Sequence, residues 1–130
     1  MTVYVCLDER NGMLFNNRRQ SRDRAVLEDI RTAVPDVLTI DPFSEKLVRE
    51  AGIPYVLADP DIPEEAHFFL EARPASHVIS HASAVVIYRW NRHYPADVRF
   101  DADLSSFTLQ STEDFPGKSH ETITKEVYVK

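Results

Sequence analysis

The last third of the chain decides the fold. It contains ASAVVIYRWNRHYPADVRFDADLSSFTLQSTEDF at residues 82–115 and TITKEVYVK at residues 122–130. Runs of β-branched and aromatic residues recur there between polar, turn-forming segments, a pattern typical of β-strands. The predicted strands are Ala84–Trp90, Val98–Phe100, Phe107–Leu109 and Ile123–Val129. Successive strands without intervening helices predict an antiparallel meander at this end of the chain.

In the first two-thirds of the chain, strands alternate with helices instead. The predicted strands are Thr2–Leu7, Val37–Ile40, Tyr55–Leu57 and His67–Leu70. Such alternation is typical of parallel pairing. Together with the meander it predicts an α/β fold: a mixed, mostly parallel sheet flanked by helices, with antiparallel C-terminal strands. No repeat or linker divides the sequence, so we expect a single domain over residues 1–130.

Three helices are predicted between these strands. Apolar residues recur at helical spacing between Ser21, the expected N-cap, and Pro35. A second helix begins at Asp41-Pro42 and ends at Gly52, because glycine suits the left-handed residue after a helix. A short helical piece follows Pro74.

Composition and charge narrow the function classes. Hydrophobic residues make up 43% of the chain, enough for a core that needs no metal or disulfide. The single cysteine, Cys6, suits a reducing compartment. No signal-peptide core opens the chain, and no run approaches the roughly 20 apolar residues that span a bilayer, so we expect a cytoplasmic protein without membrane contact. The net charge of −6 disfavours general nucleic-acid binding.

The order of these motifs resembles dihydrofolate reductase. The opening VYVCLDERNGMLFNNR, residues 3–18, is similar to that family's first strand and the glycine-containing loop after it. The two C-terminal stretches quoted above are similar to its closing strands. The middle is shorter than in the enzyme, as if one strand–helix pair were missing. The whole resembles a group of short bacterial proteins of this shape that have no settled activity.

Three departures from that family concern its cofactor phosphates. The chain has Asp41, Asp59 and Glu71 where the reductases carry a Gly-Arg-x-Thr stretch, a Ser-Arg pair and a Gly-Gly pair. Each position has lost a phosphate-binding feature and gained a carboxylate. At about 4 Å, two like charges cost roughly 1 to 4 kcal/mol, depending on screening. We therefore expect no nicotinamide cofactor, and NADPH binding in the family's manner is disfavoured.

The resemblance also implies a catalytic pair, in altered form. The family's catalytic carboxylate lies in the first turn of the first helix, where gapless alignment places Val26 and a three-residue slip places Asp23. Both registers remain open. The threonine that partners this carboxylate corresponds to Tyr88. An enzyme of this type would use Asp23 as the proton donor, beside Tyr88.

A cluster of arginines precedes the first helix, at residues 18–24. Arginine forks bind carboxylate or phosphate oxygens in pairs, and a helix N-terminus favours anions. One hypothesis is a small anionic ligand in the cleft that holds substrate in the reductases; the other is ordinary surface pairing with Asp and Glu. The candidate cleft residues are the proposed catalytic pair together with Asp8, Arg18, Arg19, Arg22 and Arg89.

Other constellations have weaker support. His77 and His81 lie four residues apart, but no partner at a diagnostic offset completes a zinc site, so we expect no metal. Ser119-His120-Glu121 supplies the residue types of a catalytic triad, yet triads are assembled across a fold and not from adjacent positions. We interpret Cys6 as a buried, unreactive thiol. Trp90–Pro95 is interpreted as a strand end that packs a loop onto the core.

These observations favour an accessory or ligand-binding protein for a small anionic molecule. The alternative is an oxidoreductase of dihydrofolate reductase type, a minimal NADPH-dependent reductase acting on a pterin-like or other small substrate. A third class is an interaction module that pairs through an exposed sheet edge, a homodimer included.

Overall fold

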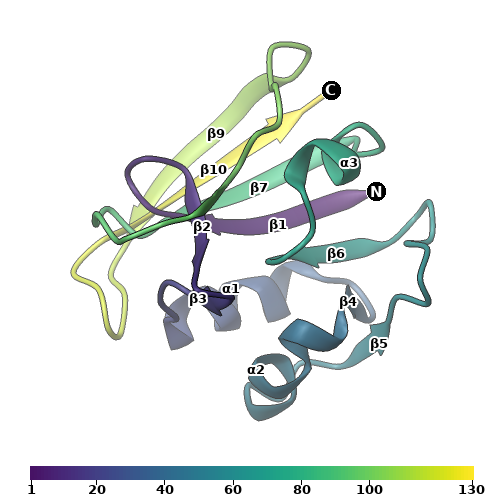
Figure 1. Cartoon of the computed structure of the whole chain (residues 1–130), viewed down its shortest axis with the longest axis horizontal. Helices are drawn as coiled ribbons and strands as arrows, with labels where there is room; N and C mark the ends of the chain where they lie inside the picture. The colour runs from purple at the N-terminus through teal and green to yellow at the C-terminus, as the bar shows by residue number, and fades with distance from the viewer.

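A seven-stranded mixed sheet forms the centre of the molecule (Figure 1). The computed structural model describes all residues, 1–130. The strand order is β5-β4-β6-β1-β7-β10-β9. The first four neighbouring pairs are parallel, and β10 pairs antiparallel with β7 and β9. The strands are β1 (Thr2–Leu7), β4 (Leu38–Ile40), β5 (Tyr55–Leu57), β6 (His67–Leu70), β7 (Ala84–Arg89), β9 (Thr108–Phe115) and β10 (Ile123–Val129). The predicted mostly parallel sheet with an antiparallel C-terminal edge is confirmed.

Helices cover both faces of this sheet (Figure 1). Helices α1 (Arg24–Ala33) and α2 (Glu45–Glu50) pack on one face, and α3 (Ala75–Ile79) packs on the other. The central strand β1 supplies both cores, because Val3 and Val5 join the α3 cluster while Tyr4 joins the cluster of α1 and α2. A strand buried on both faces is apolar throughout, which explains the unbroken TVYVCL run.

A second, three-stranded sheet has the order β3-β2-β8 and was not predicted. It consists of β2 (Gly12–Phe15), β3 (Arg18–Arg19) and β8 (Val98–Arg99). Asn16 and Asn17 join β2 to β3 with φ of 52° and 58°. Two consecutive positive φ angles define the type I′ hairpin turn, a conformation that asparagine tolerates. This hairpin holds the arginine cluster beside the large sheet.

Helix α1 begins later than the sequence indicates. Its N-cap is Asp23, which accepts a hydrogen bond from the Ala25 amide at 2.8 Å, so the expected Ser21 cap is wrong. Asp23 therefore lies just outside the helix, and Val26 occupies the first turn with its side chain in the core. The helix ends at Val34, directly before Pro35, as predicted.

The second predicted helix starts with a 3₁₀ turn, η1 (Pro42–Ser44), that leads into α2. Gly52 follows the C-cap Ala51 with φ of 72°, which confirms the predicted left-handed residue. None of the helices has the length and apolar character needed to cross a membrane.

Candidate functional site

A cavity lies between the β2–β3 hairpin, helices α1 and α2, and the carboxyl ends of β1 and β6. In open α/β sheets, ligands bind at that end of the strands. The apolar lining is Cys6, Met13, Val26, Leu27, Leu47, Phe69, Leu70 and Trp90. The polar lining is Arg19, Gln20, Ser21, Arg22, Asp23 and Glu71. Its enclosed volume of about 20 Å³ leaves room for about one water. We call it the central cavity.

Two open grooves adjoin the central cavity and share lining residues with it. The outer groove, about 510 Å³, is lined by the β2–β3 hairpin and includes Arg18 and Arg19. The basic groove, about 380 Å³, contains three cations, Arg22, Arg24 and Lys118. Its other lining residues are Leu27, Leu47, Glu50, Ala51 and Ser119. The arginines of the sequence cluster are therefore distributed along one continuous cleft.

These cations are largely without partners in the chain. Arg18, Arg24 and Lys118 form no ion pair, and Arg22 approaches Glu50 only at 3.9 Å, with both side chains well exposed. Exposed pairs at this distance contribute little free energy. The positive charge of the basic groove is available to an anion from solution.

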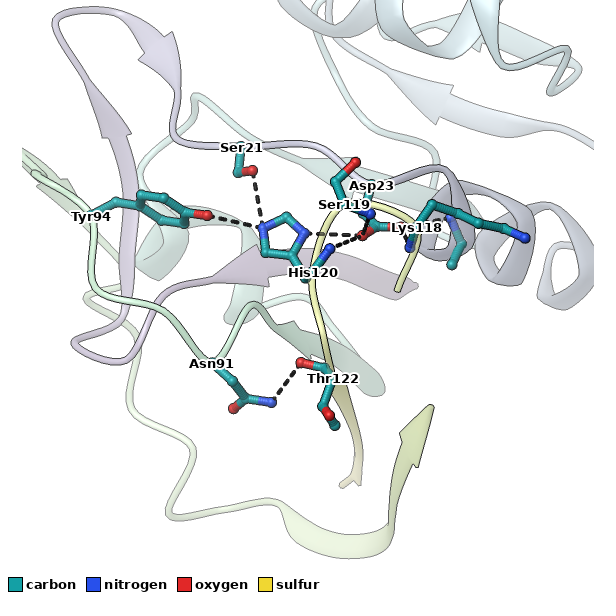
Figure 2. Close-up of polar contacts among 9 residues, drawn as sticks. Ser21, Asp23, Asn91, Tyr94, Lys118, Ser119, His120 and Thr122 are labelled. Atoms are coloured by element: carbon teal, nitrogen blue, oxygen red, sulfur yellow. Dashed lines mark hydrogen bonds and ion pairs between the residues drawn. The ribbon is translucent and has the colours of Figure 1, made fainter. Parts of the chain in front are cut away.

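Asp23 is the most heavily hydrogen-bonded side chain of the site. Besides capping α1, it accepts from the main-chain amides of Lys118, Ser119 and His120 at 2.8–3.0 Å, and from the His120 ring at 3.0 Å (Figure 2). Burial raises the pKa of Asp23, but these hydrogen bonds to the ionised form outweigh burial and lower the pKa to about 2. At neutral pH the carboxylate accepts hydrogen bonds and carries no proton to donate.

His120 lies between Asp23 and two hydroxyl groups, as Figure 2 shows. Its Nδ1 faces Asp23, while its Nε2 lies 3.1 Å from Ser21 Oγ and 3.0 Å from Tyr94 Oη. The ring stacks on Trp90 with centroids 4.6 Å apart. His120 thus has partners from two distant segments, residues 21–23 and 90–94, although the sequence placed it among scattered histidines.

Asp8, a candidate cleft residue in the sequence, is held by hydrogen bonds within the chain. Its buried carboxylate accepts from the main-chain amides of Arg10, Gly12 and Tyr94 and from the Gln20 amide group. Burial raises its pKa, but these hydrogen bonds outweigh burial and lower it. Asp8 does not line the central cavity; it fixes the turn after β1.

Tyr88 and Arg89 also lie outside the central cavity. The Tyr88 hydroxyl donates to Asp29 at 2.6 Å, and burial, reinforced by Asp29, strongly raises the pKa of this fully buried phenol. Arg89 pairs with Glu126 at 3.0 Å. Asp23 and Tyr88 therefore have separate partners and do not form the hydrogen-bonded pair that the resemblance implies.

Two of the three carboxylates at the strand ends hold arginines of the chain itself. Glu71 binds Arg19 through two hydrogen bonds of 2.7 and 2.8 Å and also accepts from Ser44. Asp41 binds Arg73 in the same forked manner. The like-charge repulsion expected from the sequence is therefore weakened, because each carboxylate is neutralised. The paired side chains of Arg19 and Arg73 instead lie at the strand ends, against Glu71 and Asp41.

The side chains that could bind a metal ion or act as a thiolate are few in this cleft. No group of three or more His, Cys, Asp or Glu residues lies close enough to hold a metal ion. Cys6 lines the central cavity, but burial strongly raises the pKa of its thiol, so the thiolate is scarce at neutral pH.

Comparison with known proteins supports the fold. No protein-family model and no curated protein matches the chain. A solved structure of dihydrofolate reductase from Enterococcus faecalis, complexed with NADP(H) and RAB-propyl, is similar with a TM-score of 0.68 and 10% sequence identity. The similarity covers 98% of this chain and 94% of that one. The chain thus has a dihydrofolate reductase-like fold, as its motifs indicated; at this identity the likeness shows the fold alone.

Proposed function

We propose that this protein binds a small anionic ligand in the basic groove and does so without a nicotinamide dinucleotide. The observation that carries the proposal is the set of three cations, Arg22, Arg24 and Lys118, gathered in one groove with almost no carboxylate partners. Arg22 and Arg24 flank Asp23, whose carboxylate already caps α1, so the attraction for a ligand anion comes from the side-chain charges of the cations.

The apolar residues of the groove define the rest of the ligand. Leu27 and Leu47 line both the basic groove and the central cavity. A flat apolar group next to the anionic group would cover these leucines at the mouth of the cavity. The cavity itself has room for about one water, so the ligand body lies over it and not within it. The ligand class is a small amphipathic acid.

The two forked ion pairs at the strand ends support a cleft without a dinucleotide. A pyrophosphate needs free main-chain amides and close backbone approach. Here Glu71 and Asp41 hold Arg19 and Arg73 at 2.7–2.8 Å. A dinucleotide would have to displace these pairs and leave two partly buried carboxylates beside its phosphates, an unfavourable exchange.

Calorimetry with dihydrofolate, an amphipathic dianion, tests the proposal. We expect binding by the wild-type protein and at least tenfold weaker binding by Arg22→Ala, because one of the three cations of the groove is lost. Arg31→Ala, which removes an exposed arginine from the other end of the same helix, is the matched control and should bind normally. Equal affinity in all three proteins, or no binding by any, would contradict the proposal.

The alternative is a minimal NADPH-dependent reductase with a pterin-like or other small substrate, and the dihydrofolate reductase-like fold is the observation that favours it. A thermal-shift titration with NADPH separates the two functions. The anion-binding proposal expects no stabilisation at sub-millimolar NADPH, and the reductase requires it.

A further inference from the structure

Ser21, His120 and Asp23 have the hydrogen-bond order of a serine-hydrolase triad. Ser21 Oγ lies 3.1 Å from His120 Nε2, and His120 Nδ1 lies 3.0 Å from Asp23 Oδ2 (Figure 2). Triads are identified by geometry and roles, not by sequence position or fold. We propose that Ser21 is an activated nucleophile and that this site cleaves small carboxylic esters by acyl transfer to Ser21.

The surroundings of His120 set its tautomer for this role. The Asp23 carboxylate is ionised and already accepts four main-chain hydrogen bonds, so it requires a donor from the ring. Nδ1 therefore carries the proton, and the Nε2 lone pair faces both Ser21 Oγ and the Tyr94 hydroxyl. Stacking against the buried Trp90 fixes the ring plane. A nucleophile, a base and an orienting carboxylate are thus held in line.

Ser21 is also placed where a substrate can reach it. It is only partly buried and lines the central cavity, while His120 and Asp23 behind it are buried. The main-chain amide of Arg22, the next residue, donates to no acceptor in the protein. In many serine hydrolases the amide that follows the nucleophile stabilises the oxyanion. The Arg22 amide is free for that role.

The reaction balances with water as the only co-reactant. Ser21 Oγ attacks the ester carbonyl carbon as its proton passes to His120 Nε2. The bond to the alkoxy oxygen then breaks, and His120 returns the proton to the leaving alcohol. Water attacks the acyl-Ser21 ester through the same base, which releases the acid and restores the serine. No metal or redox partner is required.

The lining of the central cavity defines the substrate class. The cavity has room for about one water, so the acyl group of a substrate must lie over its opening, beside Ser21 and apolar residues such as Leu27. Short apolar acyl esters fit such an opening. An ester without charge does not depend on the arginines of the basic groove, so the test below is independent of the anion-binding proposal.

A fluorophosphonate probe tests the nucleophile directly, since Ser Oγ forms a bond to phosphorus and fluoride leaves. Intact mass and peptide mapping should find one adduct, on Ser21. Ser21→Ala should abolish labelling and lower p-nitrophenyl acetate hydrolysis at least 100-fold. Ser111→Ala is the matched control, because Ser111 is an exposed serine of β9, away from the site, whose hydroxyl makes no hydrogen bond.

His120→Gln should lose labelling although Ser21 remains in place. If His120 had only a structural role, the folded variant would still be labelled. Circular dichroism and thermal unfolding verify that each variant is folded. A wild-type protein that is not labelled, an adduct on another residue, or labelling that persists in folded Ser21→Ala would overturn the proposal.

Discussion

The Nδ1 of His120 and the carboxylate of Asp23 lie 3.0 Å apart although 97 positions separate the two residues in the chain. Their contact joins the loop before β10 to the N-cap residue of α1. The same carboxylate holds three consecutive amides of that loop. Because Asp23 is where these two segments meet, its loss should affect both stability and the candidate site.

Asp23→Asn should lower the free energy of unfolding by about 2 kcal/mol, since the amide accepts fewer and weaker hydrogen bonds than the carboxylate it replaces. Urea denaturation measures the change. Asp36→Asn, an exposed aspartate without a hydrogen bond, is the control and should change stability little. Equal stabilities of the two variants would show that the Asp23 network contributes nothing.

Acid should destabilise the wild-type protein over a defined range. The pKa of Asp23 falls from 3.8 to about 2 on folding, so the stabilisation is complete above pH 4 and is lost as the pH drops toward 2. The shift corresponds to about 2 kcal/mol. Urea midpoints measured between pH 5 and pH 2 should therefore decline more steeply for the wild type than for Asp23→Asn. Parallel declines would contradict the assignment.

Gly117→Ala should destabilise the protein by about 1–3 kcal/mol, the usual cost of an overpacked site. A Cβ at this position would lie 2.5 Å from both Asp23 Oδ2 and the His120 carbonyl oxygen, so the loop must move away from Asp23. Thermal unfolding measures the effect. Ser119→Ala changes the same loop without such a contact and should unfold like the wild type.

Arg19→Met should also destabilise the protein by about 2 kcal/mol, because Glu71 would remain partly buried with Ser44 as its only partner. Glu71→Gln in the same background should recover part of the loss. A double-mutant cycle by urea denaturation measures this coupling. A coupling energy near zero would mean that the ion pair between Arg19 and Glu71 does not stabilise the fold.

Tyr94→Phe should increase fluorophosphonate labelling of Ser21 several-fold. The Tyr94 and Ser21 hydroxyls both lie within hydrogen-bond distance of His120 Nε2, which has a single lone pair. Removing the phenol leaves that lone pair to the serine. Second-order labelling rates provide the measurement, and a slower rate in Tyr94→Phe would show instead that Tyr94 positions the ring.

The sequence predicted the large sheet because its signals are local. Short runs of β-branched and aromatic residues indicated the strands, and Gly52 and Pro35 indicated helix ends. The three-stranded sheet was missed although its strand β8 lies within the predicted strand Val98–Phe100, because β3 has only two residues and gives no periodic signal. Asn16-Asn17, two residues that tolerate positive φ, is the local signal for its hairpin turn.

The candidate site was only partly predictable. The arginine cluster was visible as a run of charges, and it does line the cleft. The hydrogen-bond partners of His120 were not visible, since Ser21, Asp23 and Tyr94 lie 99, 97 and 26 positions away from it. The neutralising arginines were missed for the same reason: Arg19 is 52 positions from Glu71. Pairings of this kind depend on topology, which periodicity and propensity do not encode.

Amide chemical shifts in a ¹⁵N-labelled sample, titrated with dihydrofolate, are the most direct test of an anion-binding cleft. The account predicts perturbations concentrated at Arg22, Arg24 and Lys118, with the strand-end residues Asp41 and Glu71 unchanged, and no perturbation by sub-millimolar NADPH. Chemical-shift changes at Asp41 and Glu71 on addition of NADPH would contradict it, if dihydrofolate caused no change at Arg22, Arg24 or Lys118.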